Sequence, residues 1–363
     1  MSTLSMTTAN DLAQQLLTFY VKEGPLAQTT QNKPLLRKLT ENMDDFAGGK
    51  DNISGPVQGK FMSDTAGFYV GYTNDDSLGF TSAQDVVRYA YPWKEMAANL
   101  WITWTELKKD GITILDNKRQ SEHKNAEAVR ITTGVLKSRL ANFGEALQRA
   151  RNATLWADGS QDAAAVPGIT SILTDDPTQG TTGGIARSSA VGSLYWWQHR
   201  ALVGGLPVTA NTGPKIQSSA ASQNLSQTLR REYRQLIRYG GKPNVCLAGS
   251  AFLDALEIEV QAKGQLTLSG FTGKNATDLT MAPISLRGVG NFEYDPTLDS
   301  MGRSKFCYVY DSEHIKLRTM ESEWNKMLDP VRPYNYLVFL KTVTDTVALI
   351  CDQMNCNGVY EIA

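Results

Sequence analysis

The sequence has no run of apolar residues long enough to cross a lipid bilayer. A transmembrane helix needs about 20 consecutive, mostly apolar residues, and no stretch of these 363 residues approaches that length. The first residues, MSTLSMTTANDLAQ, also lack the basic and apolar regions of a secretory signal. We therefore expect a protein without a membrane partner.

An excess of charge of either sign is also missing. The chain has 36 Lys and Arg against 37 Asp and Glu, so its formal net charge is -1. A protein whose main task is to hold nucleic acid without sequence preference usually carries a strong basic excess. The balance argues against such binding by this chain alone.

Cysteine and histidine are scarce and are not spaced as metal ligands. None of the four cysteines forms a CxxC pair, and without an export signal we expect buried, reduced thiols. Cys351 and Cys356 are five residues apart, which predicts opposite faces of one strand. The three histidines have no second His or Cys at ligand spacing, so we expect surface or hydrogen-bonded core residues; they are His123, His199 and His314.

Catalytic motifs are absent too. The stretch GTTGG at 180–184 matches neither glycine-rich phosphate-binding pattern, and no GxSxG elbow supports a hydrolase. Three carboxylate pairs read as solvated turns, with weak calcium binding as the alternative; they are Asp44–Asp45, Asp75–Asp76 and Asp175–Asp176. The sequence therefore predicts no catalytic residue, no cofactor and no resident metal.

Residues 1–52 contain the patterns of two short amphipathic helices. The first follows Asn10 and carries Leu12, Leu16 and Phe19 on one side. The second starts at Pro34, with apolar residues at helical spacing up to Gly48; they are Leu36, Leu39, Met43 and Phe46. Helices this short are marginal in water, so each needs a partner surface.

Residues 53–108 predict a long two-stranded excursion. Leu100, Ile102 and Trp104 alternate with polar or outward residues on its returning strand. Its far end is rich in Gly, Asp and Ser and carries Phe68, Tyr69 and Tyr72. An isolated ribbon is barely stable in water, so these aromatics indicate packing outside the chain's own domain. An ordinary hairpin folded onto its own core is the alternative.

The remaining elements alternate between helices and strands. Residues 112–155 predict a strut helix approaching ~60 Å, at 1.5 Å per residue, with Leu136, Leu140, Phe143 and Leu147 on one face. A second helix near 225–239 ends at Gly240, and its inward residues are Leu229, Tyr233, Leu236 and Ile237. A buried strand (KPNVCLAGS), a helix (AFLDALEIEVQ) and several C-terminal strands follow. The order indicates an α+β or mixed α/β protein.

The most informative segment is TTGGIARSSAVGSLYWWQHR, residues 181–200. It joins a glycine–threonine turn containing Gly184 to Arg187 and to the pair Trp196–Trp197. No nucleophile with a base is present in it. Paired tryptophans after such a turn are a means of burying rigid apolar area in a core or interface, with the floor of a ligand pocket as the alternative.

Four segments in order resemble tailed-bacteriophage major capsid proteins, over nearly the whole chain. They are the hairpin with NDDSLGF and AYPWKEMAANLWITWTEL, the long helix from Ile112, GITSILTDDPTQGTTGGIARSSAVGSLYWW, and RREYRQLIRYGGKPNVCLAGSAFLDAL with the PISLRGVGNFEYDPTLDS stretch after it. The resemblance implies the Hong Kong ninety-seven phage capsid fold, of α+β class. It implies an N-terminal arm (1–52), an extended loop (53–108), a peripheral domain (109–157 and 305–363) and an inserted axial domain (158–304).

The same resemblance implies a function. Subunits would form pentamers and hexamers that close into an icosahedral shell around double-stranded DNA, in a virion assembled in the host cytoplasm. The expected partners are sister copies, a separate scaffolding protein, a portal and a decoration protein. Loop and arm residues would form the assembly interface, and they are Phe68, Tyr69, Tyr72, Leu16, Phe19 and Leu39.

Three questions stay open at this stage. Some relatives join neighbours through a Lys–Asn isopeptide bond, and Lys60, Asn355 and Asn357 are present without the family motif around them. An encapsulin-type nanocompartment would share the fold while holding enzymes as cargo. A soluble enzyme with an unrecognised pocket is the alternative from another class.

Overall fold

The computed structural model describes residues 30–61, 64, 68–75, 86–103, 142–191, 194–217, 224–262, 285–286, 290–328 and 338–363. The chain forms two compact units, which are treated separately below. The larger comprises residues 32–96, 152–324 and 346–363, and the smaller comprises 1–31, 97–151 and 325–345. The predicted helix after Asn10, with Leu16 and Phe19, lies outside the described residues, as do residues 112–141 of the predicted strut helix and His123.

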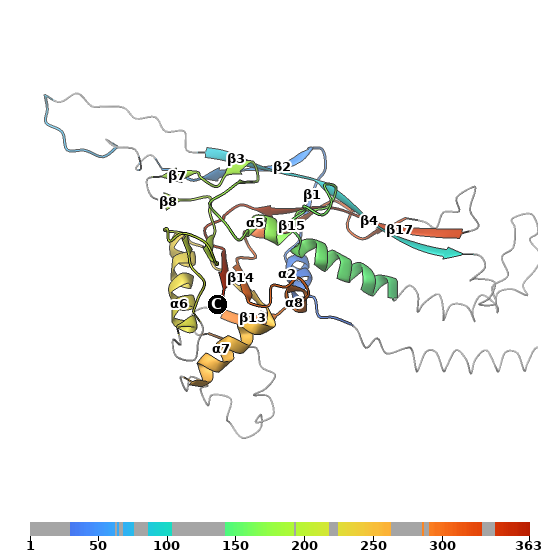
Figure 1. Ribbon diagram of the computed structural model, residues 1–363. Coiled ribbons are helices and arrows are strands. Elements are labelled where there is room, and N and C mark those ends of the chain that lie inside the picture. Colours follow the sequence, from blue (N-terminus) through green and yellow to red (C-terminus); the bar gives the residue numbers. More distant parts are fainter. Residues whose placement is uncertain are drawn as a thin grey trace, which may run out of the picture. The chain divides into compact units, whose positions relative to one another are not determined.

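A seven-stranded mixed sheet forms the centre of the larger unit (Figure 1). Its spatial order is β10-β9-β18-β14-β11-β13-β12. The strands are β9 (Arg200–Leu202), β10 (Thr212–Gly213), β11 (Val245–Ala248), β12 (Ser285–Leu286), β13 (Gly290–Tyr294), β14 (Phe306–Tyr310) and β18 (Gly358–Glu361). Strands from both sides of position 304 therefore share one sheet, with β14 antiparallel to both β11 and β18.

Alternate residues of the central strands enter two different cores. On β14, Tyr308 and Tyr310 join one buried cluster, whereas Cys307 and Val309 join the other. β11 divides in the same way, as the period of two along a strand requires. Both faces of the sheet are thus covered, which explains why β11 and β18 are buried at every position.

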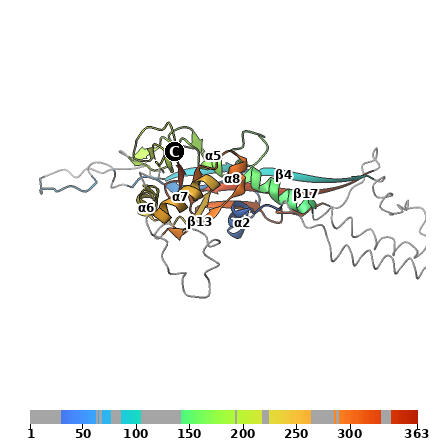
Figure 2. The same cartoon turned by 60° about the horizontal axis from the view of Figure 1, so that its bottom comes forward.

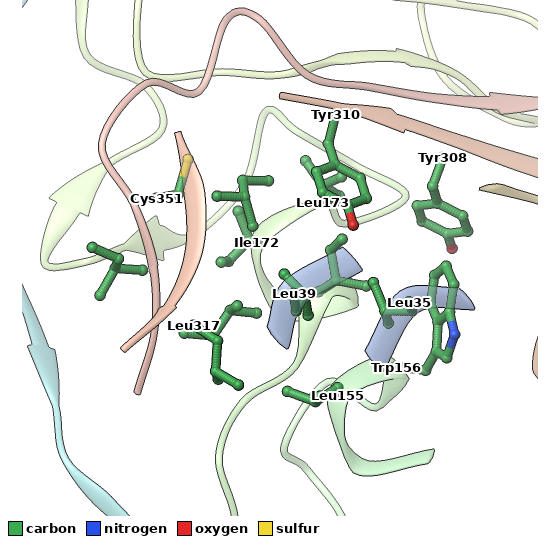
Figure 3. Close-up of a cluster of buried hydrophobic side chains, with 14 of the residues drawn as sticks. Leu35, Leu39, Leu155, Trp156, Ile172, Leu173, Tyr308, Tyr310, Leu317 and Cys351 are labelled. Atoms are coloured by element: carbon green, nitrogen blue, oxygen red, sulfur yellow. The ribbon is translucent and has the colours of Figure 1, made fainter. Parts of the chain in front are cut away.

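The first core cluster lies between β14 and several helical segments (Figure 3). Leu35 and Leu39 come from α2 (Pro34–Glu41), and Trp156 comes from the helical residues 142–156. The Trp156 ring meets that of Tyr308 edge-on at 5.1 Å, and its Nε1 donates to Asp295 at 2.8 Å. Burying this tryptophan with its polar atom paired removes the cost of an unsatisfied donor.

The chain after α2 departs from the helical prediction. The helix ends at Glu41, and β1 (Asp44–Phe46) pairs in parallel with β15 (Ile315–Met320). Asp45 accepts a hydrogen bond from Thr319 at 2.8 Å. The predicted helix through Phe46 and the predicted solvated turn at Asp44–Asp45 are therefore wrong, because a partner strand far along the chain takes these residues.

The second core cluster is covered by α6 (Leu225–Leu236) and α7 (Ser250–Ala262). The short helix η2 (Ile237–Tyr239) continues α6 and ends at Gly240, whose φ of 90° suits glycine, as predicted. Ile237 is 42% exposed, contrary to expectation. It lies beyond Leu236, the last residue of α6, in η2, where no residue is buried.

A buried carboxylate joins these two helices. Glu259 of α7 is 5% exposed and accepts from the backbone N–H of Leu225 at 2.6 Å and of Ser226 at 2.9 Å. The first N–H groups of a helix have no partner within it, and a negative charge there is favourable. Glu259 therefore satisfies the start of α6 and fixes α7 against it.

The four cysteines are buried free thiols. Cys351 ends β17 (Val338–Cys351), whose second half pairs with β15. Cys356 lies in the following turn, so the prediction of opposite faces of one strand is wrong. Both thiols donate to the carbonyl oxygen of Gln353 at 3.3 Å.

In the smaller unit, the first half of β17 pairs with β16 (Lys326–Met327). Arg151 makes a two-pronged ion pair with Asp345, at 2.7 and 2.6 Å. The part of β4 (Lys94–Thr103) in this unit contributes Asn99, which accepts from Thr342 at 2.8 Å. The predicted strand around Leu100 is present to Thr103, and Trp101 on it is 60% exposed.

Candidate interaction surfaces

Residues 181–200, named here the glycine–tryptophan segment, begin with a tight hairpin in the larger unit. Thr182 of β5 (Thr181–Thr182) pairs with Ile185 of β6 (Ile185–Ala186). The two turn residues, Gly183 and Gly184, have φ of 58° and 78°. Two consecutive positive φ angles are what a two-residue turn between right-twisted strands requires, so the paired glycines are needed for backbone geometry.

Arg187 follows the hairpin and holds several loops together. It is 2% exposed, and its guanidinium donates to Thr182 Oγ1 at 2.9 Å and to the carbonyls of Ser171 and Ile172 at 2.9 and 3.1 Å. It also bonds to Thr174 Oγ1. Burial lowers the pKa of Arg187 from its ordinary value. These acceptors are neutral oxygens, so the guanidinium holds backbone carbonyls and threonine hydroxyls of several loops in place.

The two tryptophans have different environments. Trp197 is 1% exposed and donates from Nε1 to the carbonyl of Thr182 at 2.9 Å. Trp196 is half-buried, tilted 60° to its neighbour with ring centroids 5.6 Å apart. A Cβ placed on Gly59 would lie 2.1 Å from the Trp196 ring. The Trp196 ring therefore lies directly on the backbone of the chain leaving β2 (Asn52–Gln58).

The ribbon of β2 and β3 (Val86–Pro92) is fixed at one end, named here the ribbon root and defined by Ile53, Tyr89 and Tyr91. All three are buried in the first core cluster. The Tyr91 hydroxyl donates to the Cys351 carbonyl at 3.1 Å, and burial raises its pKa. The backbone N–H of Ala90 donates to the Gly183 carbonyl at 2.9 Å, so the glycine–tryptophan segment supports the root directly.

The other end of the ribbon is exposed in the structure. The ribbon tip, defined by Phe68, Tyr69 and Tyr72, shows 51%, 96% and 65% of these side chains to solvent. Val86 and Val87 of β3 are exposed as well. Scattered apolar residues are normal on a surface, but several together on one projection indicate a site of contact.

Two other predicted residues lie inside the chain's own fold. Leu39 is 1% exposed and packs in the first core cluster, so its side chain does not belong to an outer surface. Asn357 is fully buried, with Nδ2 donating to the Gln353 carbonyl at 2.8 Å and Oδ1 accepting from the Asp311 N–H at 3.0 Å. The Asn357 amide therefore has a structural role within the subunit, whereas Lys60 is exposed.

The pKa values of the two described histidines are shifted in opposite directions. His199 is completely buried, its Nε2 lies 2.7 Å from the Thr174 carbonyl, and burial lowers its pKa to about 3. It is a neutral core residue, which agrees with the second of the two predictions made for the histidines, surface residue or hydrogen-bonded core residue. His314 lies 2.8 Å from Asp352, and this hydrogen bond raises its pKa.

Among the residues that the structure describes, one cavity and no metal-ligand cluster stand out as candidate small-ligand sites. A cavity of about 460 Å³ lies between α6 and residues 200–217. Its charged side chains include Arg200, which pairs with Glu232, and Lys215, which pairs with Glu361. Among the described residues no cluster of three potential metal ligands is found and no helix is long and apolar enough to span a membrane.

The carboxylates of Asp175 and Asp176 both have partners in the structure. Asp175 forms a two-pronged ion pair with Arg303, at 2.7 and 2.9 Å. Asp176 accepts from the N–H and the hydroxyl of Thr178. The solvated-turn prediction is therefore incomplete for this pair, because Asp175 links the segment to the turn before β14.

No protein-family model and no curated protein sequence matches this chain. Solved structures do match it. A chain of the cyanophage A-1(L) capsid asymmetric unit is similar at 13% identity, covering 93% of this chain and 94% of that one, with a TM-score of 0.63. A structure from Gordonia phage Cozz is similar at 11% identity, with coverage of 100% and 96% and a TM-score of 0.51.

These likenesses extend over nearly the full length of both chains, so they concern the whole architecture and not one shared motif. A structure from Mycobacterium phage Bobi adds a third, at 11% identity, 94% coverage of each chain and a TM-score of 0.50. At such low identity the comparison concerns the fold. The predicted fold class is confirmed: the chain has the α+β fold of phage capsid proteins, known as the Hong Kong ninety-seven phage capsid fold.

Proposed function

We propose that this chain is the major capsid protein of a tailed bacteriophage, a structural protein without catalytic activity. The proposal rests on one observation above all: the ribbon root is built into the core, while the ribbon tip exposes aromatic side chains. In a protein that stays monomeric, exposed aromatic side chains on such a projection would bury no apolar area. A neighbouring copy that buries Phe68, Tyr69 and Tyr72 would supply the apolar burial that they lack within the chain.

In this proposal, sister copies form pentamers and hexamers that close into an icosahedral shell around double-stranded DNA. Each copy makes several contacts, so closure is stable even where each contact is weak. The near-neutral chain suits a container that does not grip DNA through net charge. Residues 1–52, 53–108, 109–157 with 305–363, and 158–304 are proposed as arm, extended loop, peripheral domain and axial domain, with β14 and β18 of the third group completing the sheet of the fourth.

The proposed partners are a separate scaffolding protein, a portal and a decoration protein. The proposed location is the virion, after assembly in the host cytoplasm. Denaturing gel electrophoresis of boiled shells tests whether an isopeptide bond joins neighbouring subunits. A single band at the monomer mass is expected, because Asn357 is buried and hydrogen-bonded within its own subunit.

Electron microscopy of the purified protein tests the proposal directly. Wild-type protein is expected to form shell-sized particles, and the variant with Phe68→Ser, Tyr69→Ser and Tyr72→Ser is expected to fold but to lose them. Val208→Ser is a matched control, since Val208 is 80% exposed and lies away from the ribbon in sequence. A small discrete oligomer of wild-type protein would favour the enzyme alternative, and shells filled with protein in place of DNA would favour the nanocompartment.

A further inference from the structure

The outward side of α6 and the short helix η2 that continues it carry a row of cations. Arg231, Arg234 and Arg238 are all exposed. At about 100° per residue, Arg231 and Arg234 lie roughly 60° apart on α6, opposite the buried Leu225, Leu229 and Leu236, and Arg238 follows in η2. We name them the arginine face. Glu232 lies 3.5 Å from Arg231, but it is 2% exposed and binds Arg200, so it faces away from solvent.

The outward side of α7 has the opposite charge. Asp254 and Glu257 are exposed and again lie within roughly 60° of each other, opposite the buried Phe252 and Leu256. We name them the acidic face. α7 contains no Lys or Arg between its first and last residues, Ser250 and Ala262.

Each charged face also has an exposed apolar neighbour. Ile237, 42% exposed, adjoins the arginine face, and Ile258, 57% exposed, adjoins the acidic face. The two helices contact each other in the larger unit, and Figures 1 and 2 show them side by side but pointing in different directions. Both helices bury their inner sides in the second core cluster, so their charged faces lie on the outer side of the same pair of helices.

We propose that the arginine face of one copy docks against the acidic face of a second copy. This inference rests on the proposed shell function and adds to it the residues of one contact. In the proposed arrangement, the arginine face of each copy meets one neighbour and its acidic face meets the other. Such heterologous pairing generates a ring when the rotation closes, as a pentamer or hexamer requires.

The observations favour a protein partner over nucleic acid for the arginine face. A phosphate backbone would leave Ile237 and Ile258 without burial, whereas a second copy can cover both. The acidic face of the adjoining helix would also repel a polyanion. Opposite charges across a contact orient the partners and disfavour wrong pairings, which suits a ring that must form in one register.

The contact should be sensitive to salt. Exposed ion pairs are individually weak and are screened over about 10 Å at 0.1 M salt. A ring repeats the contact at every subunit, so small changes in one pair are multiplied. Reversing the charges of one face should therefore have a clear effect on assembly at low ionic strength.

The experiment compares the assembly of four purified proteins by light scattering and electron microscopy at 50 and 500 mM NaCl. They are the wild type, Arg234→Glu with Arg238→Glu, Asp254→Arg with Glu257→Arg, and the combination of all four changes. Lys50→Glu, at an exposed position outside both faces, shows the effect of a single charge reversal elsewhere on the chain. Circular dichroism and thermal unfolding of the unassembled proteins check that each variant folds.

Each double variant is expected to need about 10-fold more protein to assemble at 50 mM NaCl, and the combined variant should return to within about 3-fold of wild type, because opposite charges face each other again. A combined variant no better than the weaker double variant overturns the proposal. So does a pair of arginine reversals that leaves assembly at 50 mM NaCl unchanged. Wild-type protein that stays monomeric overturns the shell function as well, so the two failures can be told apart.

Discussion

The root and the tip of the ribbon both carry tyrosines, but these are buried at the root and exposed at the tip. Tyr89 and Tyr91 at the root are 6% and 9% exposed, whereas Tyr69 and Tyr72 at the tip are 96% and 65% exposed. Both pairs lie on one continuous excursion of the chain. Aromatic content therefore does not tell which end is core and which is surface; the partner supplied by the rest of the chain does.

Besides the side chains of the first core cluster, each root tyrosine contacts the backbone of a glycine. The Tyr91 ring lies against Gly183, where a Cβ would be 2.8 Å from its Cζ atom, and Tyr89 lies against Gly55, where a Cβ would be 2.4 Å from its hydroxyl. Glycine lets an aromatic face approach the main chain closely. Among the described residues of the tip, Gly71 has nothing within 4 Å of such a Cβ, so no comparable contact forms there.

The largest effect is expected from Tyr91→Ala. Truncating a buried aromatic residue leaves a cavity and costs about 3–5 kcal/mol of unfolding free energy. The measurement is urea or thermal unfolding of the unassembled protein. Tyr91→Phe keeps the ring and removes only the hydrogen bond to the Cys351 carbonyl, so a loss of about 1 kcal/mol is expected. Equal losses for the two variants would show that ring packing is not what anchors the root.

A smaller effect is expected from Gly183→Ala. Its φ of 58° is unfavourable for alanine, and the added methyl group would press on the Tyr91 ring. We expect a loss of about 1–3 kcal/mol in unfolding free energy, from backbone strain and overpacking together. Gly180→Ala is the matched control, because Gly180 also has positive φ but nothing lies within 4 Å. If the two variants lose the same unfolding free energy, the contact between residue 183 and the Tyr91 ring does not contribute to the loss.

How far the sequence predicts this structure depends on the range of the contacts concerned. The helical end at Gly240, after α6 and η2, and the helix at 250–262 were predicted, because local spacing and a glycine stop signal define them. The helix through Phe46 was not observed, because β1 pairs with Arg318–Met320, which no local pattern reveals.

The same limit applies to the candidate surfaces. Packing by Trp196 and Trp197 could be predicted from their size, and the buried Trp197 agrees with it. Their partners could not, since Gly59 lies far from them in the sequence. Leu39 was assigned to an interface on periodicity alone, which shows that a residue is buried but not whether its own chain or another covers it.

A pH effect on stability of similar or smaller size is expected from the buried His199. Burial lowers the folded pKa of His199 to about 3, below the ordinary value near 6.5. The stability from keeping it neutral is complete above about pH 6.5 and is lost as the pH falls towards 3. At pH 5 the loss is about 1–2 kcal/mol.

The measurement is the difference in unfolding free energy between the wild type and His199→Gln, taken at pH 7 and pH 5. Glutamine can keep a donor for the Thr174 carbonyl without titrating. The wild type should lose about 1–2 kcal/mol relative to the variant between the two pH values. Parallel pH profiles would mean that His199 does not resist protonation, and the acid sensitivity of this core would have another source.

The smallest effect on stability is expected from Tyr69→Ser at the tip. Its side chain is 96% exposed, and surface substitutions of this kind usually change the unfolding free energy by less than about 0.5 kcal/mol. If a neighbouring copy buries this ring, the same change removes apolar contact area that exists only in the assembled state. We therefore expect unchanged thermal unfolding of the unassembled protein together with reduced particle yield by sedimentation. A clear loss of stability in the unassembled subunit would mean that the tip packs on its own chain, and the contrast between root and tip would disappear.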